Sequence, residues 1–294
     1  MAATGWGDMT GGILTSNGKP IPCTSNYFAK LKETDPVVEE PELRARFAAD
    51  GYVLLRGLVP ADAVLDLREA YLSQFTRDFC KDGDARRGAF SGAMPPLPKH
   101  GHKGHPAHAF VRSYEFRAFA DQPIFKILAE AFLGAPSERI RRTPLRHFVP
   151  GRQVASRAHI DRTYMDGVPT DTVTIWVPLG DSPLVAGSLL YLEESHHDVS
   201  LEQRVRDAAP MDRANDNRPL THDLKWIADQ TGRRWLSADF KAGDVIVHSA
   251  TIVHASTDPG NTDYMRVSTD IRFRRIGSPA DPRWNDDWAA DDSY

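Results

Sequence analysis

Two kinds of hydrophobic pattern follow one another along this chain. Apolar residues recur at helical spacing over residues 42–47, 60–75 and 121–133. Residues 52–56 (YVLLR) predict a strand, and from Thr143 onward short runs alternate with turn residues. These runs predict strands at residues 146–149, 154–159, 172–179, 188–192, 234–237, 244–248 and 265–273. We therefore expect a β-sandwich or barrel preceded by helices.

Three segments lack this periodicity. Residues 1–40 are rich in small and polar residues, which predicts an N-terminal arm that is either wrapped on the domain or poorly ordered. Residues 82–108 are dense in Gly, Pro, Arg and His, and a loop of that length inside a compact domain is commonly a lid or a binding loop. Residues 196–233 are polar and predict an insertion between two strands. We expect residues 41–294 to form one domain.

Composition narrows the possible partners. A chain of 294 residues with 41% hydrophobic content can bury one sizeable core. Its net charge of −4 offers no electrostatic footprint for nucleic acid or for a membrane surface. Two cysteines, Cys23 and Cys80, are too few for a disulfide framework, and no apolar run approaches the ~18 residues of a membrane span. The sequence thus predicts a cytoplasmic protein with a small-molecule partner, and it leaves the oligomeric state open.

A His-x-Asp motif is the first candidate for chemistry. His159 and Asp161 stand two residues apart, so in an extended chain both side chains point to the same face and can reach one ion. His254, which follows the strand-like residues 243–248, is the expected third ligand, with His248 as its alternative. Two histidines and one carboxylate on one side of a metal leave the opposite positions open, as in non-haem Fe(II) oxygenases.

An arginine follows the third expected ligand by twelve residues. Arg266, Ser268 and Asp270 share one face of an alternating run. An arginine on the inner face of a strand would be a costly buried charge unless it met an anion. A guanidinium suits a carboxylate held by two bonds, and Ser268 is a candidate extra donor.

A central strand supplies two weaker candidates. Trp176 shares a strand face with Thr172 and Thr174, whereas the opposite face is aliphatic. The mixed face predicts a pocket wall, with Thr174 as a contact for the cosubstrate. The alternative is a tryptophan at the edge of the sheet.

Arginines are concentrated beside the His-x-Asp motif. Seven of them lie between Arg139 and Arg162, and strand parity with His159 would turn Arg157 and Gln153 inward. We expect this density to help bind an anionic substrate group such as a carboxylate or a phosphate. The alternative is a set of solvated surface arginines.

Four histidines occupy the long loop, at positions 100, 102, 105 and 108. The loop has no predicted strand that would fix their geometry. This favours a mobile lid or a solvated loop over a second metal site.

Taken together, these residues resemble the phytanoyl-CoA dioxygenase family of Fe(II)/2-oxoglutarate-dependent oxygenases. The resemblance covers about residues 43–284. Residues 47–57, FAADGYVLLRG, are similar to the family's N-terminal signature. Its central strand pair is similar to residues 173–181 (VTIWVPLGD), 187–189 and 195–196, and its C-terminal signature to the run from Gly243-Asp244 through His254 to Arg266.

The resemblance implies a mainly β fold with flanking helices around a double-stranded β-helix (jelly-roll, cupin-like) core. It implies that His159, Asp161 and His254 bind Fe(II), that Arg266 binds 2-oxoglutarate, and that O2 is the second cosubstrate. The expected activity is hydroxylation of an unactivated C–H bond of a small molecule, coupled to decarboxylation of 2-oxoglutarate to succinate. On the breadth of the family, we expect a role in secondary metabolism.

Related halogenases replace the carboxylate ligand by a small residue, so the presence of Asp161 favours hydroxylation. Desaturation, epoxidation and cyclisation use the same ligands and stay open, as does the primary substrate. Two other classes are a non-catalytic metal-binding jelly-roll protein and a zinc hydrolase with a His2Asp site. The hydrolase would give Arg266 no role.

Overall fold

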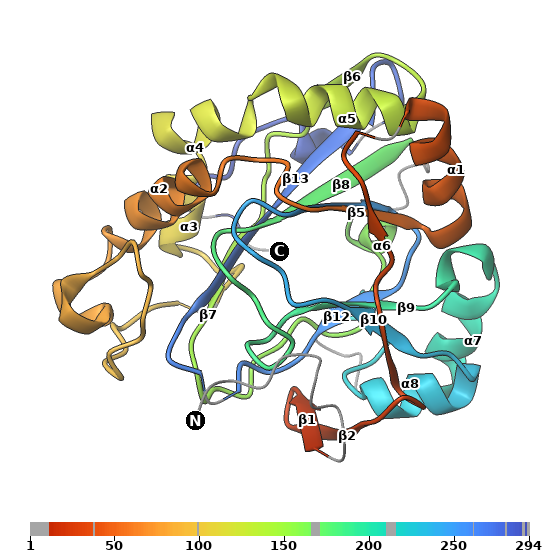
Figure 1. The fold of residues 1–294 in the computed structure, drawn as a ribbon, viewed down its shortest axis with the longest axis horizontal. Coiled ribbons are helices and arrows are strands. Elements are labelled where there is room, and N and C mark those ends of the chain that lie inside the picture. Colours follow the sequence, from red (N-terminus) through yellow and green to blue (C-terminus); the bar gives the residue numbers. More distant parts are fainter. Residues whose placement is uncertain are drawn as a thin grey trace.

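Two β-sheets face each other, and helices cover the outer side of each sheet (Figure 1). The structure is a computed structural model that describes residues 12–37, 39–98, 100–165, 171–209, 216–260, 262–279, 281–289 and 292. Most strand pairs are antiparallel, and the parallel pairs are β3 with β10 and β4 with β5.

The larger sheet has seven strands in the order β4-β5-β11-β8-β13-β6, and β7 also pairs with β13. They are β4 (Glu33–Thr34), β5 (Tyr52–Leu55), β6 (Ser137–Arg139), β7 (Leu145–Phe148), β8 (Thr172–Pro178), β11 (Val245–Ser249) and β13 (Arg266–Arg275). Along β8, Val173, Ile175 and Val177 face the helices, whereas Trp176 belongs to the core between the sheets. The alternation predicted for this strand is confirmed.

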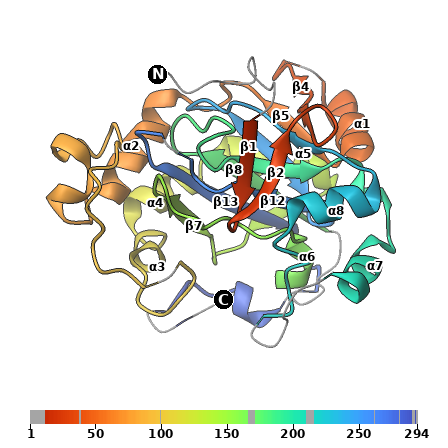
Figure 2. The same ribbon diagram turned by 90° about the horizontal axis from the view of Figure 1, so that it is seen from below.

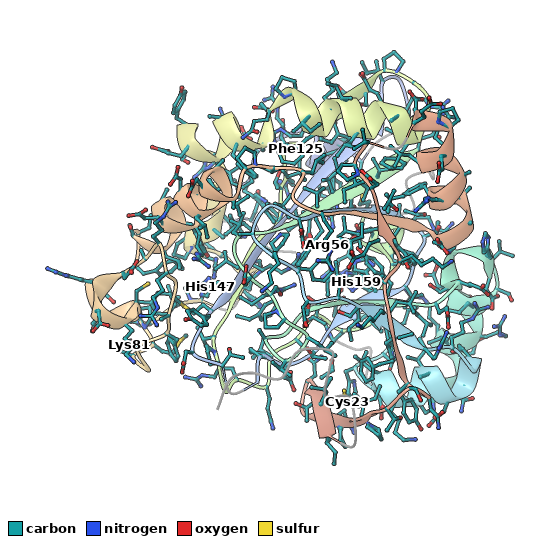
Figure 3. All side chains as sticks on the ribbon, in the orientation of Figure 1. Cys23, Arg56, Lys81, Phe125, His147 and His159 are labelled. Atoms are coloured by element: carbon teal, nitrogen blue, oxygen red, sulfur yellow. The ribbon has the colours of Figure 1, made fainter. Side chains whose placement is uncertain are left out.

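The smaller sheet has four strands in the order β12-β9-β10-β3. They are β3 (Phe28–Lys30), β9 (Leu189–Leu192), β10 (Trp235–Ser237) and β12 (His254–Ser256). Apolar side chains from both sheets fill the space between them, among them Tyr52, Tyr191 and Phe240. Figure 3 shows His159 between the two sheets.

Helices complete both outer faces. The larger sheet is covered by α1 (Glu40–Asp50), α2 (Ala61–Leu72), α4 (Tyr114–Ala120) and α5 (Pro123–Leu133), and the smaller sheet is flanked by α7 (Leu201–Ala208) and α8 (Leu224–Thr231) (Figure 1). Shorter helices are α3 (Pro106–Phe110) and α6 (Asp161–Tyr164), with 3-10 turns at Arg77–Phe79, Lys81–Gly83, Ser195–His197 and Pro282–Trp284. In the described ranges, no helix has both the length and the apolar character that a membrane span requires.

The three expected helices correspond to α1, α2 and α5. Helix α1 ends where Gly51 takes a left-handed φ of 75° and its N–H donates to the carbonyl of Phe47. The buried stripe of α5 includes Phe125, Leu128 and Phe132, which pack with β8 and β13 in the larger core. These boundaries follow from local signals that the sequence displays directly.

The expected N-terminal arm is part of the sheets over residues 12–37. Strands β1 (Gly12–Ser16) and β2 (Lys19–Cys23) form a hairpin whose two-residue turn, Asn17-Gly18, has positive φ at both positions. The carboxylate of Asp258 accepts hydrogen bonds from the N–H groups of both turn residues, at 2.8 and 2.9 Å. Figure 2 shows the hairpin on the face of the molecule that is seen from below. Farther along, β3 and β4 each join a main sheet.

The strand predicted at residues 154–159 and the solvated state expected for the long loop are both wrong. In residues 154–159 only Ala158 and His159 make bridges, to Thr221 and His254, and these stay isolated because the stretch pairs with two different segments. His105 and His108 of the long loop are buried rather than solvated, at 3% and 4% exposure. The rings of His105 and His147 lie 5.7 Å apart, and His108 stacks on Trp288 at 4.5 Å, so packing fixes this part of the loop.

The expected insertion at residues 196–233 contains α7 and α8, and its residues 210–215 lie outside the described part. Helix α8 begins at a cap in which the Asp223 carboxylate accepts a hydrogen bond from the N–H of Trp226. Its buried residues Leu224 and Ile227 pack in the core around β9 and β10. The insertion thus stabilises the smaller sheet.

A substitution at Gly243 can test how tightly the turn before β11 is packed. Its φ is +97°, and an added Cβ would lie 2.5 Å from the backbone oxygen of Val59. We expect Gly243→Ala to lower the free energy of unfolding by about 3 kcal/mol, because strain and a backbone clash add. The control is Gly232→Ala, where φ is +65° and nothing lies within 4 Å of the added Cβ, with an expected loss of about 1 kcal/mol. Urea unfolding measures both, and equal losses would contradict the packing argument.

Candidate active site

The two sheets bring the three predicted metal ligands together. His159 and His254 exchange backbone hydrogen bonds of 3.0 and 2.9 Å, which place both imidazoles on the same side of the smaller sheet. Asp161 follows as the first residue of α6. All three side chains are buried, and one potential ligand atom from each lies within 4.8 Å of the others. Among the described residues, this is the one group of His, Cys, Asp or Glu side chains that lie close enough together to hold a metal ion.

Hydrogen bonds fix the orientation of both imidazoles. Nδ1 of His159 donates to the carbonyl of Arg157 at 2.6 Å, and Nδ1 of His254 donates to the carbonyl of Ile252 at 3.1 Å. Because a carbonyl only accepts, each ring carries its proton on Nδ1 and has Nε2 available as a ligand. Burial lowers the pKa of His159 to about 4 and that of His254 well below its usual value. Both rings are therefore neutral at physiological pH, as metal binding requires.

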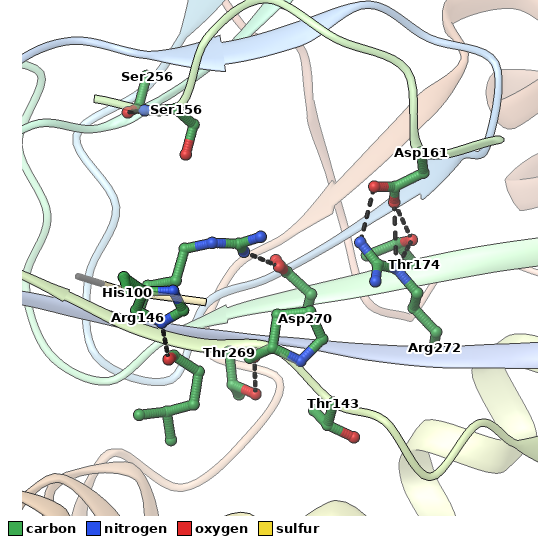
Figure 4. Close-up of polar contacts among 12 residues, drawn as sticks. His100, Thr143, Arg146, Ser156, Asp161, Thr174, Ser256, Thr269, Asp270 and Arg272 are labelled. Carbon is green, nitrogen blue, oxygen red and sulfur yellow. Dashed lines mark hydrogen bonds and ion pairs between the residues drawn. The ribbon is translucent and has the colours of Figure 1, made fainter. Parts of the chain in front are cut away.

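Asp161 is the most heavily bonded residue of the site (Figure 4). Arg272 donates to both carboxylate oxygens, at 2.7 and 3.3 Å, and the Thr174 hydroxyl donates to Oδ2 at 2.6 Å. Burial alone would raise the pKa of Asp161, but the charge of Arg272 and the hydrogen bond with His248 lower it by more, so the net pKa lies well below the usual range. The carboxylate is ionised and held in one orientation. Thr174, predicted as a cosubstrate contact, is here a partner of Asp161.

Arg272 was missed by the sequence interpretation. It stands on β13 opposite Thr174 of β8, on the same strand face as Arg266, Ser268 and Asp270. Extending that alternation by one more step would have placed it in the interior. Its partner could not be identified in advance, since 111 residues separate Arg272 from Asp161.

His248, the alternative third ligand, lies behind Asp161. Its Nε2 is 3.3 Å from Oδ2 of Asp161, and its Nδ1 bonds to the Tyr191 hydroxyl at 2.7 Å. Both ring nitrogens therefore have protein partners. His254 instead directs its Nε2 toward Oδ1 of Asp161, at 3.7 Å, and has only a backbone partner on Nδ1. The geometry supports His254 as the ligand and His248 as a residue that supports Asp161.

Arg266 is a buried guanidinium that forms no ion pair in the described part of the chain. Its side chain lies over the rings of Phe148, at 4.6 Å, and Trp176, at 5.6 Å. The residue is 3% exposed, and neither Nε nor Nη1 has a hydrogen-bond partner in the described structure. Burial lowers its pKa to about 9, so it is still charged at neutral pH. A buried, charged, unpaired donor set of this kind fits an oxyanion ligand.

The remaining predicted residues take different positions. Ser268 is buried on β13, two residues beyond Arg266. Trp176 lies on the central strand β8 and contacts Arg266, so the alternative of a tryptophan at the edge of the sheet is wrong. Gln153 is exposed and lies beside Gly18 of the hairpin, since the parity expected for a strand does not apply here. Arg157 binds Asp216 at 2.7 Å and is partly exposed.

Comparison with known proteins identifies what this arrangement resembles. The sequence model described as phytanoyl-CoA dioxygenase (PhyH) matches residues 47–266. Comparison with curated proteins finds none that matches this sequence.

Solved structures share the fold. The epimerase SnoN in complex with Fe3+, alpha ketoglutarate and nogalamycin RO is 20% identical, covering 83% of this chain and 86% of its own, with a TM-score of 0.57. The non-heme alpha ketoglutarate dependent carbocyclase SnoK from nogalamycin biosynthesis is 20% identical, covering 86% and 90%, with a TM-score of 0.57. EctD from S. alaskensis, in its apoform, is 15% identical over 99% and 93%, with a TM-score of 0.58. The expected jelly-roll core with flanking helices is confirmed.

The two candidate third ligands can be separated by metal titration. We expect His254→Ala to reduce Ni(II) affinity by more than about 100-fold, because it removes one of three ligands, and His248→Ala to reduce it by about tenfold, because it removes only a supporting contact. Calorimetric titration without O2 measures both, and His102→Ala, at an exposed histidine, is the control. A larger loss in His248→Ala than in His254→Ala would exchange their roles.

Proposed function

The chain belongs to the phytanoyl-CoA dioxygenase family, and from that membership and the geometry of its site we propose that it is an oxygenase that hydroxylates an unactivated C–H bond of a small molecule. Its cofactors are Fe(II), 2-oxoglutarate and O2. The observation that carries the proposal is the coexistence of a buried His-Asp-His group and a buried, unpaired guanidinium in one interior. A zinc hydrolase would need the first and leave the second without a function.

Each residue of the interior has a definable task. His159, Asp161 and His254 would hold Fe(II), and Arg266 would bind the distal carboxylate of 2-oxoglutarate, with Ser268 close by. Phe148 and Trp176 cover the guanidinium and exclude water from it, which strengthens its bond to a carboxylate. When bound, Fe(II) with 2-oxoglutarate and O2 supplies the oxidation: one oxygen atom enters the substrate as a hydroxyl, and the other enters succinate as CO2 leaves.

Asp161 bears on the type of reaction. A halogenase of this kind needs room for a halide where the carboxylate stands, and here Arg272 and Thr174 hold that carboxylate in place. Hydroxylation is therefore favoured over halogenation. The likeness to an epimerase and a carbocyclase, both named in nogalamycin biosynthesis, supports a second candidate, in which the same site performs a cyclisation or a related C–H oxidation in secondary metabolism.

Succinate formation is the direct test. We expect the Fe(II)-loaded protein to convert 2-oxoglutarate and O2 to succinate and CO2, with a rate that rises when a substrate is added, because substrate and cosubstrate oxidation are coupled. Chromatography of succinate measures it, and the Asp161→Ala variant is the inactive control. Tight 2-oxoglutarate binding without succinate across a broad panel of small molecules would favour the non-catalytic jelly-roll class.

Arg266→Met separates cosubstrate binding from folding. Because Nε and Nη1 of the guanidinium have no hydrogen-bond partner in the described residues, removal of the guanidinium should leave the melting temperature of the metal-free protein unchanged or raised. Affinity for 2-oxoglutarate should fall by at least about 100-fold, since two charge-assisted bonds are lost. Calorimetry measures both, and Arg275→Met, at an exposed arginine of the same strand, should leave the affinity unchanged. A destabilised Arg266→Met protein would contradict the account of an unpaired charge.

A further inference from the structure

A second charged group lies at the edge of the metal site and has no task in the proposed reaction. Asp216 accepts one hydrogen bond from Arg157, at 2.7 Å to Oδ2, and another from Arg218, at 2.9 Å to Oδ1. Two guanidinium groups thus share one carboxylate, and this cluster of Arg157, Asp216 and Arg218 carries one excess positive charge. The three side chains are 37%, 18% and 28% exposed, so the cluster is open to solvent on one side.

The cluster is attached to the metal site through Tyr164. The guanidinium of Arg218 lies 4.7 Å from the centre of the Tyr164 ring, and that ring makes an edge contact with His159 at 5.0 Å. Tyr164 ends the single turn that begins at Asp161. Arg157 also contacts His159, because its backbone carbonyl accepts a hydrogen bond from Nδ1 of His159. A group bound by these arginines would therefore lie next to an expected iron ligand.

The net charge of the interior also favours an anionic ligand. Arg272 forms an ion pair with Asp161 and the partly exposed Arg146 forms one with Asp270, whereas the buried Arg266 has no carboxylate partner in the described residues. A divalent metal ion and a dianionic cosubstrate would cancel each other, so one positive charge would stay unbalanced in a poorly solvated space. The outer cluster adds a second positive charge, which is open to solvent on one side. The excess charge of the interior is costly unless an anion joins it.

We propose that the primary substrate carries an oxyanion, a carboxylate or a phosphate, that binds Arg157 and Arg218 beside Tyr164. This inference rests on the proposed oxygenase function and assigns a substrate class to its site. Each guanidinium has five N–H donors, and the bonds to Asp216 use one side-chain donor on each, so a bound oxyanion meets donors from both arginines. Binding there fixes one end of the substrate and leaves its remainder to extend toward the face of His159.

The test uses inorganic phosphate as the probe, with protein loaded with Co(II) and saturated with 2-oxoglutarate under argon. Saturation occupies Arg266, so phosphate can report only another site. Paramagnetic broadening of the phosphorus resonance, compared with the Zn(II)-loaded protein, measures phosphate bound near the metal. We expect saturable broadening in the wild-type protein and at least an about tenfold weaker affinity in Arg157→Gln/Arg218→Gln, since each charge-assisted bond contributes about a factor of ten. Labelled acetate, titrated in the same way, shows which oxyanion binds more tightly.

Asp216→Asn distinguishes a ligand site from a structural ion cluster. If the arginines bind an anion, removal of the competing carboxylate should strengthen phosphate binding severalfold; if the cluster only joins residues 216–218 to the site, the variant should not bind more tightly. The control is Arg204→Gln/Arg234→Gln, which removes two surface ion-paired arginines and should leave phosphate binding unchanged.

Failure of this inference and failure of the proposed function give different results. If the wild-type protein does not bind 2-oxoglutarate in calorimetry, the proposed function is wrong. The other case is that 2-oxoglutarate binds, with an affinity that agrees within about twofold between the wild type and all variants. If phosphate and acetate then do not bind, or bind the double variant as tightly as the wild type, the oxyanion site is wrong. Tighter binding in Asp216→Asn together with weaker binding in the double variant supports it.

Discussion

The bonds from Arg272 and Thr174 to the carboxylate of Asp161 are the interaction on which the rest of the interior depends. A buried carboxylate is stable only when it is paired and hydrogen-bonded, and β13 and β8 supply the two partners from adjacent strands. The carboxylate is thereby held opposite two imidazoles whose own orientations are fixed by backbone carbonyls. One face of β13 thus carries two guanidinium groups in different surroundings. Arg272 forms an ion pair with Asp161, whereas Nε and Nη1 of Arg266 have no hydrogen-bond partner in the described residues.

Much of this could be predicted from the sequence, because much of it is local. Alternation along β8 assigns its two faces without knowledge of the partner strands, and Gly51 ends α1 by its own conformation. The His-x-Asp spacing places two side chains together before any fold is known. The match over residues 47–266 and the solved structures then confirm the family and the jelly-roll fold, whereas the ligand roles stay predictions that the geometry supports.

What could not be predicted depends on residues far apart in the chain. The partner of Arg272, the burial of His108 against Trp288, and the sharing of Asp216 by Arg157 and Arg218 are each set by the packing of distant segments. The hairpin at the N-terminus is a different case. Its Asn17-Gly18 turn is a local signal for a tight β-hairpin, but the surrounding composition is typical of a loose arm and hides that signal.

The way Asp161 is held also bears on how this scaffold could acquire another chemistry. Shortening the side chain at position 161 would empty a small volume lined by the Arg272 guanidinium and the Thr174 hydroxyl, two donors that would then face no acceptor from Asp161. A cavity with a fixed positive charge and a hydroxyl donor beside a metal attracts a small anion such as chloride. Arg272 and Thr174, which now hold the carboxylate of Asp161, would therefore be the first two donors of a halide site. The residues that favour hydroxylation in this protein would thus also favour halide binding once the carboxylate is removed.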